Sequence, residues 1–115
     1  MPYYVQGVQT DSINEYYVSQ VFDQLKYDYD YQVPIMGGTS LRGGQVLDFL
    51  LDLSPLPVPV LIQGVYWHNN PAMEAFREIA IHEYGKGYWD ELVKLDEEET
   101  NSFEAAYDAV KRKIR

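Results

Sequence analysis

Two short apolar segments joined by a proline-rich turn constrain the fold of this chain most strongly. Residues 45–53 and 59–64 have the length of strands and are bounded by turn-forming residues. Between them, Pro55, Pro57 and Pro59 remove amide donors and fix φ, so the connection is not helical. The spacing predicts two neighbouring strands that can form a hairpin. The second segment is an apolar run of the kind that is buried on both faces of a sheet.

Asp48 interrupts the first apolar segment, between Val46 and Leu47 on one side and Phe49 and Leu50 on the other. A carboxylate in such a run is expensive to desolvate unless it is paired, hydrogen-bonded or bound to a metal. Strict alternation places Leu47 and Phe49 together on the opposite face, so we expect Asp48 on an apolar face near a strand end. The alternative is a carboxylate that faces solvent at a sheet edge. Buried carboxylates are rare and cluster at functional sites, which favours a functional role.

Three further segments have the apolar spacing of helices, and two more predict strands. The helices are expected at 12–25, 71–84 and 102–113, and the strands at 27–35 and 92–95. The first and last helices begin with capping-box spacing, Ser12 with Glu15 and Asn101 with Glu104. The predicted order is therefore α-β-β-β-α-β-α in a single domain, residues 1–115.

The second helix has a clear start and an expected apolar stripe. Asn70 and Pro71 fit the N-cap and the first helical position. The stripe consists of Ala72, Phe76, Ile79 and Ala80.

Composition excludes several classes of protein. The chain of 115 residues has no cysteine, which rules out disulfides, thiolate zinc sites and a cysteine nucleophile. No segment approaches the length of a membrane span and no signal peptide is recognised, so we expect a soluble cytoplasmic protein without a membrane partner. The net charge of −9 counts against tight nonspecific binding to nucleic acid, although four basic residues gather in the tail.

Polar and aromatic residues follow the second apolar segment. Gln63 ends it, and Tyr66, Trp67 and His68 come next. His68 is either a surface residue or a general acid or base near neutral pH. The two rings serve either core packing or stacking on bases. The glycine pairs before residue 45 are explained by turn geometry, with Arg42 available to a phosphate.

Segments 43–49 and 63–68 resemble the PD-(D/E)XK nuclease superfamily, with weaker support from Asn14-Glu15 and Tyr31-Gln32. The similarity is to the very-short-patch-repair-like branch and to related phage and homing endonuclease-like proteins, and it spans roughly residues 12 to 100. The resemblance implies an α/β (α+β) restriction-endonuclease-like domain with a central mixed sheet flanked by helices.

The resemblance also implies a function, the hydrolysis of DNA phosphodiester bonds. Asp48, Glu15 and the backbone carbonyl of Ile62 would hold Mg²⁺ or Mn²⁺, which polarises the phosphate and activates water. His68 and Gln63 would position that water. The implied partner is duplex DNA, which could be nicked, mismatched or branched. It would be bound by a homodimer or within a larger nucleoprotein complex. The residues in contact with the DNA would be Arg42, Tyr66 and Trp67.

The chain departs from the superfamily pattern at the (D/E)-x-K triplet. Leu61 stands at the acidic position and Gln63 at the lysine, although the very-short-patch branch also lacks that acid. The main alternative is a catalytically degenerate nuclease-fold module for nucleic-acid binding or protein assembly in a phage or mobile-element complex. For Glu15, the alternative is simply to satisfy the helix N-terminus. A third interpretation is a small interaction domain with no nucleic-acid role.

Overall fold

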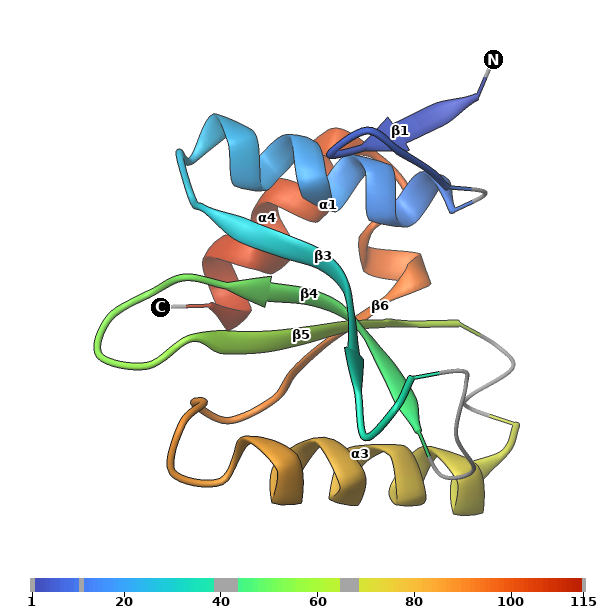
Figure 1. Cartoon of the computed structure of the whole chain (residues 1–115). Helices are drawn as coiled ribbons and strands as arrows, with labels where there is room; N and C mark the ends of the chain where they lie inside the picture. The colour runs from blue at the N-terminus through green and yellow to red at the C-terminus, as the bar shows by residue number, and fades with distance from the viewer. Residues whose placement is uncertain (1, 11, 39–43, 65–68, 115) are drawn as a thin grey trace.

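The computed structural model of the chain describes residues 2–10, 12–38, 44–64 and 69–114, which form three layers. A mixed sheet lies between helices α1 and α4 on one face and helix α3 on the other (Figure 1). The strands are β1 (Tyr3–Val5), β2 (Val8–Thr10), β3 (Tyr29–Ile35), β4 (Gln45–Leu51), β5 (Val58–Gln63) and β6 (Val93–Asp96). The helices are α1 (Ile13–Gln24), α3 (Pro71–Gly85) and α4 (Phe103–Lys113), with a short 3-10 turn, η1 (Glu97–Glu99).

The main sheet has the strand order β3-β4-β5-β6. β4 pairs antiparallel with both β3 and β5, so the predicted hairpin around the prolines is confirmed. β6 adds parallel to β5 after the α3 crossover. Every residue of β5 is buried, as its apolar run predicted. The mixed α/β class expected from the sequence is therefore confirmed.

The element order differs from the predicted one at the N-terminus. The chain begins with a hairpin of β1 and β2 ahead of α1, so the order over the described residues is β-β-α-β-β-β-α-β-α. The hairpin turns at Gln6 and Gly7, both with positive φ, and the Tyr3 ring packs on Tyr16 of α1 with centroids 5.0 Å apart. Strands of three residues are too short to leave a periodic signal, which explains why the sequence did not predict them.

Strands β3 and β4 bend sharply together (Figure 1). On the two sides of the bend their side chains enter different core clusters. Tyr31 and Phe49 pair across the two strands and enter the core beneath α1 and α4. Val33 and Leu47 form the next pair and pack on the α3 side. Between these pairs, Gln32 has a φ of 54°, which breaks the alternation. The prediction that Leu47 and Phe49 share one face is therefore wrong.

Helix α3 buries a different stripe from the predicted one. Ala80 is buried as expected, but Phe76 and Ile79 are 53% and 62% exposed. The buried face instead carries Arg77 and Ile81. A basic residue on that face concealed the true stripe, because an apolar pattern search does not count arginine.

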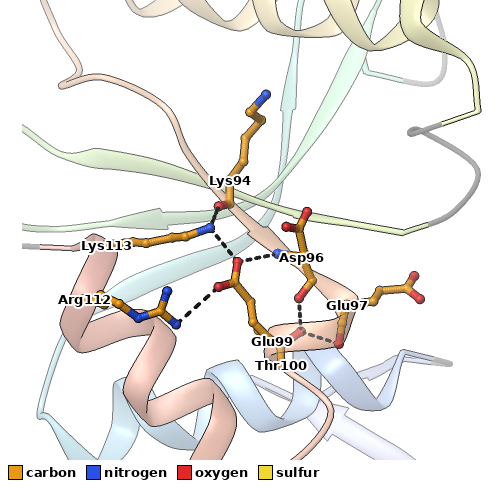
Figure 2. A network of polar contacts seen from close by, with 7 residues as sticks. All are labelled: Lys94, Asp96, Glu97, Glu99, Thr100, Arg112 and Lys113. Atoms are coloured by element: carbon orange, nitrogen blue, oxygen red, sulfur yellow. Dashed lines mark hydrogen bonds and ion pairs between the residues drawn. The ribbon is translucent and has the colours of Figure 1, made fainter.

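The acidic turn η1 connects α4 to β6 through hydrogen bonds and ion pairs (Figure 2). Glu99 accepts hydrogen bonds from the side chains of Lys113 and Arg112 and from the Asp96 amide, while buried Thr100 donates to the Asp96 carbonyl at 2.9 Å. Partial burial raises the pKa of Glu99, but the Lys113 and Asp96 hydrogen bonds outweigh it and lower the pKa below its ordinary value. Two of the tail's basic residues are therefore already paired within the fold.

The start of α4 differs from the predicted cap by one residue. Ser102, rather than Asn101, is the N-cap, and its hydroxyl accepts the Ala105 amide hydrogen at 3.1 Å. At α1 the predicted N-cap is confirmed, since Ser12 accepts from the Glu15 amide. Every helix and strand predicted from residue 12 onward is present.

Candidate functional site

Asp48 lies where β4 separates from β5. The paired positions of these strands run from Leu51 with Val58 to Phe49 with Val60, and none is formed beyond. There Asp48 Oδ2 accepts the amide hydrogen of Ile62 at 2.8 Å. The carboxylate thus satisfies a β5 donor that the departing strand leaves open. Asp48 is buried as predicted, with only 15% of its side chain exposed, and the alternative of a solvent-facing carboxylate is wrong. It lies in the middle of β4 rather than near a strand end, and the charged Arg77 is beside it.

The N-terminal hairpin takes over the capping role expected of Glu15, and the Glu15 side chain binds Tyr31 instead. The Ser12 amide donates to Thr10 Oγ1 at 3.0 Å, which is the hydrogen bond that Glu15 would accept in a complete capping box. Glu15 Oε1 instead accepts from the Tyr31 hydroxyl at 2.7 Å. The alternative that Glu15 only satisfies the helix N-terminus is therefore wrong.

The charge of Glu15 acts on the ionisation of Asp48. The pKa of Asp48 is raised from 3.8 to about 7, mainly by burial and in addition by the charge of Glu15. The Ile62 amide and the Arg77 guanidinium oppose this rise. Burial also raises the pKa of Tyr31, and its bond to Glu15 adds to the rise. Asp48, Glu15 and Tyr31 therefore form one electrostatic unit contributed by β4, α1 and β3.

Arg77 completes this unit, and sequence reasoning did not identify it. Its guanidinium NH2 lies 3.7 Å from Asp48 Oδ2 and 3.5 Å from the Val46 carbonyl oxygen. Burial lowers the pKa of Arg77, while Asp48 and the neighbouring acids raise it. No signal in the sequence identifies Arg77, because the face that α3 buries is set by its packing on the sheet.

Gln63 is buried at the end of β5, only 1% exposed, and its Nε2 has no hydrogen-bond partner among the described residues. It lies opposite Asp96 in the parallel register. The Glu97 carboxylate lies over the following Gly64, in the space that a Cβ there would occupy. The proposed water-positioning role of Gln63 remains a prediction.

Leu61, at the position of the superfamily's second acid, belongs to the α3-side core. It is fully buried and clusters with Ile35, Leu47 and Ile81. The backbone of Ile62 reaches Asp48 through its amide, and the role expected of its carbonyl is untested. The remaining predicted site residues, Arg42, Tyr66, Trp67 and His68, lie outside the described residues.

The site offers a metal ion two carboxylates, those of Asp48 and Glu15. Within residues 2–10, 12–38, 44–64 and 69–114, no group of three or more acidic or histidine side chains is placed to hold one. Asp48 Oδ1 takes part in no hydrogen bond or ion pair within the described structure. Mg²⁺ commonly uses one or two carboxylates and completes its coordination with water and substrate phosphate, so these donors fit it.

Comparisons with protein-family models, curated proteins and solved structures find no match to this chain. Over its described part, the fold contains no helix long and apolar enough to cross a membrane.

Proposed function

We propose that this protein is a Mg²⁺-dependent endonuclease of the PD-(D/E)XK type, which hydrolyses DNA phosphodiester bonds at Asp48. One observation carries the proposal. Asp48 is buried where β4 leaves β5, with the Arg77 guanidinium 3.7 Å from its Oδ2, and burial together with the charge of Glu15 on α1 raises its pKa to about 7. A buried carboxylate whose pKa is raised in this way is typical of catalytic and metal-binding sites.

The connectivity of the core supports the same proposal. From α1 to β6 the elements run α-β-β-β-α-β, and the sheet order β3-β4-β5-β6 is antiparallel, antiparallel and then parallel. This is the order that the resemblance implies for a restriction-endonuclease-like core. Asp48 lies on the second strand of that core, where the superfamily carries its aspartate.

Each residue of the unit has a chemical part in this proposal. Asp48 and Glu15 would hold Mg²⁺, and the metal would supply charge stabilisation at the scissile phosphate. Tyr31 fixes Glu15 through its hydroxyl, and the Ile62 amide fixes Asp48. Arg77 lies beside Asp48 and has the planar fork that suits a phosphate oxygen pair.

A second function, binding without catalysis, is favoured by the surroundings of Asp48. The Arg77 guanidinium already lies 3.7 Å from Asp48 Oδ2, where it partly neutralises the carboxylate. Leu61 fills a core position instead of supplying a second acid on β5. A nuclease-fold module that binds nucleic acid, or assembles with other proteins on it, would keep this arrangement.

Cleavage assays separate the two functions. Purified protein is incubated with nicked, mismatched, branched and plain duplex DNA in Mg²⁺, in Mn²⁺ or in EDTA. We expect metal-dependent cleavage that falls to background in Asp48→Asn and Glu15→Gln. The matched control is Asp52→Asn, the same change at an exposed carboxylate just beyond β4, which should keep activity. Binding without cleavage in every metal would support the non-catalytic function, and failure to bind DNA at low salt would refute both.

A further inference from the structure

We infer that Arg77 opposes divalent-cation binding at Asp48 until a phosphodiester group is present, so that the site takes up metal and nucleic acid together. The inference rests on the proposed function, since it concerns the same acidic site. It adds a role for Arg77 that neither the sequence pattern nor the carboxylate pair contains.

The Arg77 guanidinium is held at the site by the packing of α3. Only 7% of its side chain is exposed, and the NH2 atom lies near both Asp48 Oδ2 and the Val46 carbonyl, at 3.7 and 3.5 Å. One turn further along α3, Ile81 is buried in the core against Leu47 and Leu61. Because the helix is anchored there, the positive charge stays beside Asp48 when a cation approaches.

The balance of charge then decides what the site accepts. With both carboxylates ionised, Asp48, Glu15 and Arg77 carry a net charge of −1. A divalent cation alone would leave the site with a net positive charge beside a buried guanidinium, which is costly where the effective dielectric is low. One phosphodiester group restores neutrality. Metal and substrate should therefore bind cooperatively, and by linkage each should raise the affinity of the other equally.

Two acids on the same helix as Arg77, Glu74 and Glu78, reduce this repulsion in part. Lys94 ion-pairs with both of them, at 3.6 and 3.0 Å, and neutralises one of their two charges. The Tyr31 hydroxyl is already bound to Glu15. Among the described residues, Asp48 and Glu15 thus remain the acids that Arg77 and a metal would share.

The first test measures Mn²⁺ binding without nucleic acid, by the electron paramagnetic resonance signal of free Mn²⁺ at pH 8.5. We expect Arg77→Gln to bind Mn²⁺ about ten-fold more tightly than wild type, because a buried positive charge has been removed. Arg77→Lys, which keeps the charge, should stay within about three-fold of wild type, and adding Asp48→Asn should abolish the gain. Affinity in folded Arg77→Gln equal to or weaker than that of wild type would overturn the inference.

The second test measures the coupling between metal binding and DNA binding. The affinity for a labelled nicked duplex is determined by fluorescence anisotropy in EDTA and in Ca²⁺, a divalent ion chosen because it permits binding measurements. Wild type should bind about ten-fold more tightly in Ca²⁺, and Arg77→Gln should lose most of that difference. If Arg77→Gln does not fold, wild type alone decides, since an unchanged affinity in Ca²⁺ refutes the inference. Tighter Mn²⁺ binding by Arg77→Gln without any DNA cleavage would remove the proposed enzyme function and leave this inference standing.

Discussion

Thr10 Oγ1 accepts the amide hydrogen of Ser12 at 3.0 Å, and this bond decides what Glu15 does. In an ordinary capping box the glutamate would take that hydrogen. Here the strand β2 ends with a hydroxyl in the same place, so Glu15 turns to Tyr31, and from there its charge acts on Asp48. Glu15 therefore belongs both to the capping-box pattern in the sequence and to the candidate site. The N-terminal hairpin frees its side chain from the capping role.

Removal of the Thr10 hydroxyl should let Glu15 return to its capping role. Thr10→Val then costs little stability, because the Glu15 carboxylate can accept the Ser12 amide hydrogen. In a Glu15→Ala background that replacement is missing, and the same change should cost about 1 kcal/mol more. Urea unfolding of the two single variants and the double variant measures this coupling. Strictly additive free energies would show that Glu15 cannot reach the Ser12 amide.

Asp48→Ala should be much more destabilising than Asp48→Asn. Both variants leave Arg77 beside no carboxylate, but alanine also leaves the Ile62 amide without its acceptor, which costs about 1–3 kcal/mol more. Asparagine keeps an acceptor oxygen for Ile62 and loses only the charge. Chemical denaturation at pH 8 compares the two, with Asp52→Asn as the exposed control. Equal losses from alanine and asparagine would mean that the Ile62 hydrogen bond contributes nothing.

The raised pKa of Asp48 should make stability fall as the pH rises from about 4 to about 7. In this window the unfolded chain has lost the Asp48 proton and the folded protein retains it, so folding takes up a proton. Above pH 7 both states are ionised and stability falls no further from this cause. Asp48→Asn lacks this titration, so the difference in unfolding free energy between the variants should change across the window, by up to about 1.4 kcal/mol for each pH unit. Urea unfolding in EDTA measures it, and a constant difference would contradict the prediction.

The sequence predicted those features that local patterns determine. The apolar run of β5, the prolines before it and the cap of α1 are all read from neighbouring residues, and each is confirmed. Asp48 could be identified because one carboxylate in an apolar strand is conspicuous wherever the strand packs.

The features that were missed depend on tertiary contacts. The role of Arg77 requires the rotation of α3, which is set by Ile81 packing on the sheet, and no pattern within the helix reveals it. The bend at Gln32 requires a positive φ at a residue that is not glycine, so the alternation of β4 could not show that its faces change. The position of Glu15 likewise depends on Thr10, from a hairpin too short to predict.

Two isoleucines of α3 offer a matched test of the helix orientation. Ile81 is 1% exposed and Ile79 is 62% exposed, although the sequence predicted that Ile79 belonged to the packed stripe. Ile81→Ala should cost about 2–5 kcal/mol by leaving a cavity. Ile79→Ala should change stability by no more than about 0.5 kcal/mol. Thermal unfolding of the pair measures this, and a large loss at Ile79 would mean that the exposed face is covered in the folded protein.

Leu61→Glu tests whether the superfamily's missing acid could simply be restored. Leu61 is fully buried against Leu47 and Ile81, so a glutamate there would place a carboxylate in an apolar core. We expect a loss of about 3 kcal/mol or more and no gain in Mn²⁺ affinity. Leu61→Met, which keeps an apolar side chain of similar volume, should cost less than about 1.5 kcal/mol. A folded Leu61→Glu variant that binds Mn²⁺ more tightly than wild type would instead place residue 61 beside Asp48. The protein would then be a nuclease that has lost one metal ligand. The burial of Leu61 in the core would not prevent an acid from acting at that position.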